Sequence, residues 1–291
     1  MLESMMLMEW SWIEKYLGDI KSVKGGFTKA IRGIVKLPER RVFVKIGVDE
    51  TTSNWIQREI EVYRILQNHK YTHSPKLLSI KEDQTAFAIE AKEESKGWDW
   101  SNNWNTERLF KTFEAMDDLA NIILESTEKD FFNSENGLEN ENGWKTLANN
   151  VDLQKLILEK VGMLSIDKII SMSQLNTEFI FDKTTLVHND VRSDNCAWNQ
   201  LTQKITLVDW NWTQLGDRRI DVNAVLVDVA LSGIDVFNIK KNRLDKNALV
   251  WLAGFWFKSA ATKLSTTINL GSLIDFQIKS GITALELSMK M

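Results

Sequence analysis

The sequence predicts an α+β protein in which a small antiparallel β-sheet with one helix precedes a larger, mainly helical part. Short apolar runs rich in β-branched residues, separated by turn residues, characterise residues 20–91. After residue 105, apolar residues recur every three or four positions over stretches long enough for helices. A chain of 291 residues can also form more than one hydrophobic core. We therefore expect two lobes, residues 1–91 and 92–291.

The N-terminal lobe is expected to contain a five-stranded sheet. In the run from Ala86 to Glu90, alternate residues are expected to face opposite sides of this sheet. An amphipathic helix is predicted over residues 55–66, and a shorter one over residues 9–17 would act as a lid or a brace. The runs that predict strands are residues 30–36, 41–46, 76–80 and 85–91.

The C-terminal lobe is expected to begin with a polar linker over residues 93–105, which helices follow. Aromatic residues crowd one of its helices, and packing against the rest of the lobe is the preferred explanation. A wall for a planar or sugar-like ligand is the alternative. Helices are predicted over residues 107–125, 143–161, 165–181, 220–231, 245–262 and 267–290.

Composition excludes several classes of protein. Hydrophobic residues make up 43% and charged residues 26%, which is typical of a globular protein in water. A net charge of -4 gives no general attraction to nucleic acid or to an anionic membrane, so neither is an expected partner. The single cysteine, Cys196, excludes an intrachain disulfide and fits a cytoplasmic location. No apolar run reaches the length of a membrane span, and residues 1–8 lack the features of a signal peptide.

One polar stretch in the second lobe carries the strongest chemical signal. The apolar residues 186–187 predict a short buried strand. Residues 188–195, with the sequence His-Asn-Asp-Val-Arg-Ser-Asp-Asn, contain too many turn formers to continue that strand. We therefore expect Asp190 and Asn195 on a loop that a rigid scaffold holds in place.

A second strand, residues 205–208, ends in the single carboxylate of Asp209. Phosphoryl transfer from a nucleotide gives a role to Asp209 and to both loop residues. This chemistry needs a carboxylate to orient the attacking hydroxyl and oxygen ligands to hold Mg²⁺ against the phosphates. In this interpretation Asp190 is the catalytic base, and Asn195 and Asp209 are the metal ligands. Taken singly, Asp and Asn are also common in ordinary turns.

The spacing of these residues resembles that of a known family. His-x-Asp, four further residues and Asn, followed by a hydrophobic strand that ends in Asp-Trp, is similar to a pattern in the aminoglycoside phosphotransferase and choline kinase family. Residues 216–221 are similar to that family's Gly-Asp-Pro-x-x-Asp segment, with Arg218 where proline is usual. The resemblance implies a two-lobed, protein-kinase-like fold and a small-molecule kinase.

The resemblance also implies nucleotide contacts in the N-terminal lobe. Lys45, set among the apolar residues of its strand, would reach the α and β phosphates, and an acid on the next helix would hold it there. Glu59 and Glu61 both lie on that helix. Glu59 is preferred, because Arg58-Glu59 followed by a helical pattern resembles the family's segment, and Glu61 is the alternative.

A glycine turn and a hinge complete the implied nucleotide site. The backbone of the turn would close over phosphates, although adjacent glycines more often form a simple hairpin. The backbone of the hinge would hydrogen-bond a purine edge without choosing between ATP and GTP. The residues are Gly25, Gly26, Phe27 and Thr28 in the turn and Glu90, Ala91 and Lys92 in the hinge.

Three further residues are expected to support the loop rather than to react. The ring of His188 is expected to hydrogen-bond the backbone and fix the loop. Asp217 is expected to pack or cap at the exit of the metal strand, and Asp221 to cap the following helix. Acids that would anchor a cationic acceptor are Asp228, Asp235, Asp275 and Glu286.

The sequence therefore predicts an enzyme that transfers the γ-phosphate of ATP or GTP, with Mg²⁺, to a hydroxyl of a small molecule such as an aminoglycoside or another antibiotic. A choline, amino-alcohol or sugar kinase is the nearest alternative. A nucleotide-binding regulatory module without catalysis is an alternative of another class. A protein kinase has no support, because no Ala-Pro-Glu segment follows Asp209. The acceptor, the nucleotide, a role in antibiotic resistance and the choice between monomer and dimer stay open.

Overall fold

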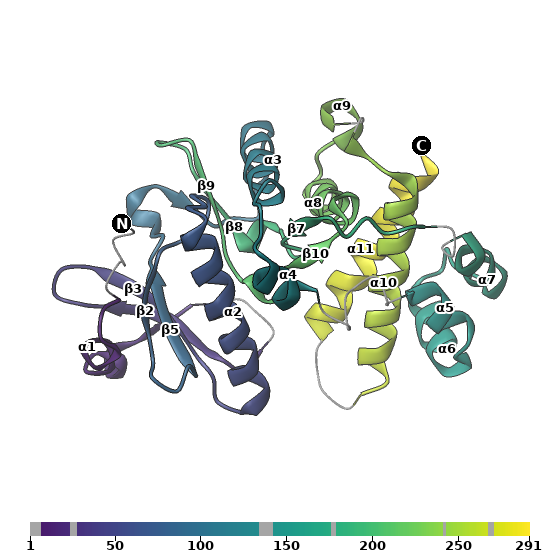
Figure 1. Ribbon diagram of the computed structural model, residues 1–291. Helices are drawn as coiled ribbons and strands as arrows, with labels where there is room; N and C mark the ends of the chain where they lie inside the picture. Colours follow the sequence, from purple (N-terminus) through teal and green to yellow (C-terminus); the bar gives the residue numbers. More distant parts are fainter. Residues whose placement is uncertain (1–6, 24–27, 134–141, 176–178, 241–242, 267–270) are drawn as a thin grey trace. The chain divides into compact units, whose positions relative to one another are not determined.

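The computed structural model describes residues 7–23, 28–133, 142–175, 179–240, 243–266 and 271–291 (Figure 1). The chain forms two compact units. Unit 1 contains residues 1–102, 110–122 and 193–213, and unit 2 contains residues 103–109, 123–192 and 214–291. The lobe boundary after residue 91 stays a prediction. Asn195 and Asp209 belong to unit 1, together with the N-terminal sheet, whereas Asp190 belongs to unit 2.

Unit 1 is built on the five-stranded antiparallel sheet that the sequence predicts. Its strand order is β1-β2-β3-β5-β4. The fifth strand, β1, is only two residues long and pairs with β2. The strands are β1 (Lys21–Ser22), β2 (Ile31–Lys36), β3 (Arg41–Ile46), β4 (Leu77–Ile80) and β5 (Ala86–Glu90).

Helices cover both faces of this sheet (Figure 1). On one face, Trp10 and Ile13 of α1 (Trp10–Glu14) join a buried cluster with valines and alanines of the strands, so the short N-terminal helix is a brace. On the other face lies α2 (Glu50–Asn68), whose Tyr63 ring lies 5.5 Å from that of Phe87. Because both faces are covered, residues 86–89 of β5 are all buried.

Helix α2 begins five residues earlier than predicted because of a capping box. The side chain of Asp49 accepts hydrogen bonds from the backbone N–H of Thr52 (2.8 Å) and from its hydroxyl. In return, the hydroxyl of Thr52 accepts from the backbone N–H of Asp49 (3.1 Å). These bonds satisfy amide groups that have no partner within the helix. The apolar spacing alone did not reveal this start.

The predicted linker over residues 93–105 contains regular structure in its first half, between residues 94 and 99. A 3₁₀ turn, η2 (Glu94–Lys96), is followed by β6 (Trp98–Asp99). Strand β6 pairs with β8 (Cys196–Asn199), which pairs in turn with β9 (Lys204–Leu207). A two-residue strand has no sequence signal of its own, since it forms only where another strand offers an edge. Cys196 in β8 is fully buried, as expected for a small apolar residue.

The mainly helical part is confirmed, with differences in helix boundaries. Asn149 ends one helix and the side chain of Asn150 caps the next, so the predicted helix over residues 143–161 is two helices. Residues 176–178 and 267–270, within two other predicted helices, lie outside the described residues. The helices are α3 (Thr106–Ala120), α4 (Ser126–Phe132), α5 (Gly143–Ala148), α6 (Val151–Lys160), α7 (Ile166–Leu175), α8 (Arg218–Leu231), α9 (Val236–Lys240), α10 (Lys246–Leu264) and α11 (Gly271–Met289).

The core of unit 2 surrounds α10. Its residues Trp251 and Phe257 are buried, and the indole of Trp144 in α5 donates to the carbonyl of Val250 at 2.7 Å. Close approach of α5 to α10 depends on Gly254, because a Cβ there would overlap the Trp144 ring. The preferred explanation of the aromatic residues, packing, is thus confirmed for these. Across the stretches that the structure describes, no helix is long and apolar enough to cross a membrane.

Gly254→Ala is expected to destabilise the protein. Overpacking a filled core costs about 1–3 kcal/mol, and replacing glycine within a helix returns at most about 1 kcal/mol. Urea denaturation should therefore show a net loss of up to about 2 kcal/mol. Gly162→Ala is the control, because a Cβ at Gly162 has no heavy atom within 4 Å. Equal stabilities of the two variants would contradict the packing argument.

Candidate active site

The strongest feature of unit 1 is a buried ion network around Lys45. Lys45 lies on β3 and is only 6% exposed. Its Nζ donates to Glu59 Oε2 on α2 at 2.5 Å and to Asp209 Oδ1, which follows β9, at 2.9 Å. Glu61 instead pairs with Arg64 on the exposed side of the helix. The structure thus brings together Lys45, Glu59 and Asp209, and it puts Glu61 elsewhere.

Burial and neighbouring groups shift the pKa values of Lys45 and Asp209. Burial lowers the pKa of Lys45, but the charges of Glu59 and Asp209 outweigh it, so the pKa of Lys45 is raised. Burial raises the pKa of Asp209, but the charge of Lys45, hydrogen bonds from Lys45 and Asn211 and the charge of Arg32 lower it to about 2. An ammonium and a carboxylate therefore face each other at neutral pH.

Asp209 is held in an unusual backbone conformation. Its φ of +66° lies in the left-handed region, which is strained for a residue with a Cβ. The amide of Asn211 donates to Asp209 Oδ1 at 2.8 Å and, at 3.4 Å, to Glu59 Oε2. Asn211 therefore links both carboxylates of the network. The side chain of Asp209 keeps 35% exposure, so it stays accessible to a ligand.

Asn195 and Asp209 lie at the same end of the β8–β9 pair. Cys196 pairs with Leu207 there, and the backbone N–H of Val208 donates to the carbonyl of Asn195 at 3.0 Å. This proximity follows from the strand register, since Asn195 directly precedes β8 and Asp209 comes two residues after the end of β9.

These residues fit a magnesium ion that a nucleotide brings with it. Mg²⁺ prefers oxygen ligands and commonly takes one or two from protein carboxylates, with phosphate oxygens and water as the rest. Asp209 and Asn195 offer such oxygens, and Oδ1 of Asn211 is a buried oxygen without a hydrogen-bond partner. Among the described residues, no three His, Cys, Asp or Glu side chains gather as a metal site.

In unit 2, the polar loop follows β7 (Thr185–Val187), which pairs with β10 (Gln214–Gly216). His188 is fully buried, and its Nδ1 accepts a hydrogen bond from the backbone N–H of Asp190 at 3.2 Å. The predicted structural role of His188 is confirmed. This bond requires a ring without a proton on Nδ1, so the loop geometry depends on the tautomer.

Asp221 anchors the same loop, which corrects the prediction that it caps a helix. Its carboxylate accepts the backbone N–H groups of His188 (3.2 Å) and Asn189 (2.8 Å). The cap of α8 is Asp217, which accepts from Arg219 N at 2.8 Å. Because α8 begins at Arg218, Asp221 lies inside the first turn, where it is no longer a cap.

Arg192 is a loop residue that the sequence reasoning missed. Its Nε lies 3.5 Å from Asp190 Oδ1, and its guanidinium lies 5.3 Å from the centre of the Phe276 ring. The guanidinium of Arg192 therefore lies close enough to the Asp190 carboxylate to form an ion pair. Its place two residues after Asp190 was the only available signal.

The structural role of Arg58 was also not predicted from the sequence. It donates to the carbonyls of Asn211 (3.2 Å) and Thr213 (2.7 Å). These two bonds tie α2 to the segment that follows Asp209, within unit 1. Burial lowers the pKa of Arg58. The neighbour of Glu59 therefore helps to hold Asp209 in place.

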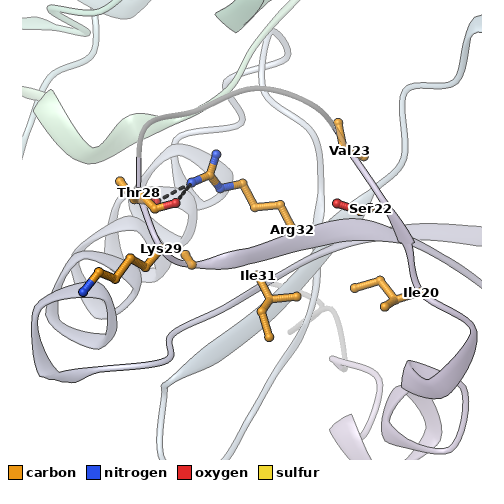
Figure 2. A pocket seen from close by; sticks show the side chains of 8 residues that line it. Ile20, Ser22, Val23, Thr28, Lys29, Ile31 and Arg32 are labelled. Carbon is orange, nitrogen blue, oxygen red and sulfur yellow. Dashed lines mark hydrogen bonds between the residues drawn. The ribbon is translucent and has the colours of Figure 1, made fainter. Parts of the chain in front are cut away.

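The predicted turn and hinge are described only in part. Gly25, Gly26 and Phe27 lie outside the described residues. Thr28 accepts hydrogen bonds from Arg32 Nη2 through its carbonyl (2.9 Å) and its hydroxyl (Figure 2).

In the hinge, Glu90 ends β5 and Ala91 is buried. Lys92 Nζ bonds Glu90 Oε2 at 2.8 Å and lies over the Trp98 ring. The carbonyl of Lys92 accepts from the Trp100 indole at 2.7 Å. That bond fixes the chain just after the predicted purine contact.

Two of the four acids considered for a cationic acceptor have local roles. Asp228 accepts a hydrogen bond from the indole of Trp104 at 2.8 Å. Asp235 Oδ1 accepts from the backbone N–H of Phe237 at the start of α9 (3.0 Å). Neither contact marks an acceptor site.

Solved structures of small-molecule kinases share this fold. The chain is similar to a spectinomycin phosphotransferase in complex with ADP and spectinomycin, with a TM-score of 0.65, 11% identity and coverage of 97% of this chain and 98% of that one. It is similar to choline kinase LicA from Streptococcus pneumoniae (TM-score 0.61, 11% identity, 94% and 97% covered). It is also similar to an ethanolamine kinase from Plasmodium vivax (TM-score 0.58, 14% identity, 94% and 82% covered).

These likenesses establish the class of fold, a protein-kinase-like α+β fold, as the sequence predicts. At 11–14% identity they establish the fold alone. No family model matches the sequence, and no curated protein matches it either. The residues of the site are therefore the evidence for the activity.

Glu59→Ala is expected to destabilise the protein by about 3–5 kcal/mol, because it leaves a buried lysine with only one of its two carboxylates. Glu61→Ala is the matched control from the same helix. Its pair with Arg64 is about 40% exposed, so the expected change is within about 0.5 kcal/mol. Urea denaturation of both variants provides the measurement. A Glu61 variant as unstable as the Glu59 variant would refute the network as drawn.

The titration of Asp221 should appear in the pH dependence of stability. Burial is the main cause that raises its pKa from 3.8 to about 6, although the N–H groups of His188 and Asn189 oppose the shift. The folded carboxyl therefore keeps its proton to a higher pH than the unfolded one. Rising pH from about 4 to 6 ionises the unfolded state first and so disfavours folding.

Asp221→Asn removes this titration. The stability of wild type minus that of the variant should therefore fall as the pH rises from about 4 to 6, by at most about 1.4 kcal/mol for each pKa unit that separates the two states. Denaturation curves at half-unit pH intervals provide the measurement. A difference that is constant over this range would show that Asp221 has an ordinary pKa.

Proposed function

We propose that this protein is a kinase that transfers the γ-phosphate of ATP or GTP to a hydroxyl of a small molecule. The observation that carries the proposal is the ion network of Lys45 with Glu59 and Asp209. It gathers a strand lysine, a helix glutamate and a strand-terminal aspartate within a kinase-like fold. Phosphoryl transfer needs little covalent chemistry from the protein, so positioning and charge account for most of the catalysis.

Unit 1 would hold the nucleotide. Lys45, steadied by Glu59, would contact phosphate oxygens, and Asn195 and Asp209 would hold the metal. When bound, Mg²⁺ neutralises developing charge on the phosphates. Contact of Asp209 with the metal would weaken its bond to Lys45 and direct that ammonium to the phosphates. Thr28 and the hinge backbone at Glu90, Ala91 and Lys92 would complete the nucleotide contacts.

Unit 2 would supply the base. Asp190 would accept a hydrogen bond from the acceptor hydroxyl, orient its oxygen toward the γ-phosphorus and take its proton as the new P–O bond forms and the bond to the leaving diphosphate breaks. The side chains of Asp221 and His188 hold the backbone that leads up to Asp190, through the N–H groups of Asn189 and Asp190. This anchoring limits the reorganisation that the reaction requires.

The proposed acceptor of the phosphoryl group is a small molecule that carries a hydroxyl. The similar structures include enzymes named for choline, ethanolamine and spectinomycin, and one complex with streptomycin. All four compounds join a hydroxyl to a basic or quaternary nitrogen. We propose such an amino alcohol or aminocyclitol antibiotic as the acceptor, and the cytoplasm, where ATP and GTP are abundant, as the location.

Asp190→Ala is expected to lower kcat by about 10²–10⁴-fold, because the acceptor hydroxyl loses its base, and to leave the Kd for Mg²⁺-nucleotide unchanged. The measurement is release of ADP or GDP across a panel of aminoglycosides, other antibiotics, amino alcohols and sugars. Asp182→Asn is the control, because Asp182 is an exposed carboxylate earlier on the same segment.

Full turnover in Asp190→Ala would exclude Asp190 as the base. Nucleotide binding without turnover for any acceptor would favour the regulatory module over the kinase. Absence of nucleotide binding by the wild type would refute the proposed function itself.

A further inference from the structure

The register of the sheet places a second cation directly beside Lys45. In the pairing of β2 with β3, Arg32 is the residue opposite Lys45. Residues that face each other across antiparallel strands project from the same face of the sheet. Figure 2 shows Arg32 on one side of β2 and Ile31 on the other. Arg32 and Lys45 therefore share the face from which Lys45 reaches Glu59 and Asp209.

Two like charges opposite each other normally destabilise a sheet. Here two carboxylates, Glu59 and Asp209, accompany them, and the charge of Arg32 contributes to lowering the pKa of Asp209. The guanidinium therefore acts on the same carboxylate as Lys45 does. If Asp209 turned to a metal, its negative charge would be shared between the metal and the two cations, Lys45 and Arg32. An incoming anion such as phosphate would then meet two positive charges on the same face of the sheet.

The side chain of Arg32 borders a cavity of about 220 Å³ at the start of β2. This volume is several times the roughly 30 Å³ that one water molecule takes in the liquid. Its lining is mixed: polar residues, including Ser22, Thr28 and Lys29, alternate with apolar ones (Figure 2). Arg32 Nη2 donates to the carbonyl and hydroxyl of Thr28, which are both neutral acceptors.

We propose that Arg32 is a second cationic contact for the phosphates of the nucleotide, acting beside Lys45. The inference rests on the proposed kinase function and adds a residue that determines the preference for a triphosphate. A guanidinium has several donors in a planar fork that matches phosphate oxygens. Its bonds to charged oxygens are about twice as strong as bonds between neutral groups, so phosphate can replace Thr28 as its acceptor.

A purely structural role would make Arg32 the side chain that holds Thr28 at the start of β2. The two roles differ in one measurable respect. A structural role changes the affinity for all nucleotides by a similar factor, whereas a phosphate contact changes it in proportion to the phosphates present. The ratio of affinities for ATP and AMP separates them.

The experiment is calorimetric titration of the full chain with ATP, ADP and AMP, or GTP, GDP and GMP if guanine binds better, in Mg²⁺. Arg32→Gln is expected to weaken triphosphate binding by about tenfold to a hundredfold, the effect of losing hydrogen bonds to a charged group. Monophosphate affinity should change by less than about twofold. Lys36→Gln is the matched control, because it removes one exposed positive charge from the same strand.

A further variant protects the test against misfolding. Arg32→Lys keeps the charge and should recover part of the triphosphate preference that Arg32→Gln loses. Equal losses for tri- and monophosphate in Arg32→Gln, or no loss at all, would overturn the role of Arg32 and leave the kinase proposal standing. A wild type that binds no nucleotide would overturn both.

Discussion

The burial of one ammonium group organises unit 1. Lys45 is almost inaccessible to water, and a charge in that position is tolerated only with close counter-charges and hydrogen bonds. Glu59 and Asp209 supply them from segments far away in the sequence. Strand β3, helix α2 and the segment after β9 must therefore meet at one point. Arg58 and Asn211 reinforce that meeting, because each bonds a second part of the network.

In unit 2, the buried polar groups that need partners are the backbone N–H groups of the loop after β7. A loop that leaves a buried strand exposes backbone N–H groups to an apolar interior, and each needs an acceptor. Asp221 accepts two of these groups and the ring of His188 accepts a third. Buried side chains thereby fix the backbone from residue 188 to the N–H group of Asp190 before any ligand binds. Such preorganisation is what catalysis by a positioned carboxylate requires.

Predictions from sequence succeeded where the signal is local. The bounds of β3 and the loop after β7 follow from runs of apolar and turn-forming residues. The choice of Glu59 over Glu61 agrees with the ion network, although it came from a resemblance. The start of α2 was missed because apolar periodicity says nothing of a polar cap. The strand β6 was missed because a strand of two residues exists only through its partner.

By itself, the sequence determined the α+β class, the chain order of β2, β3, α2, β4 and β5, and the candidate residues Asp190, Asn195 and Asp209, because periodicity and motif spacing are properties of contiguous residues. Only the tertiary structure decided which groups touch. In the structure, strand register places Arg32 opposite Lys45. Asp221, predicted to cap a helix, anchors a loop, and Arg192 lies beside Asp190. Such contacts depend on where separate segments pack, and no local pattern encodes that.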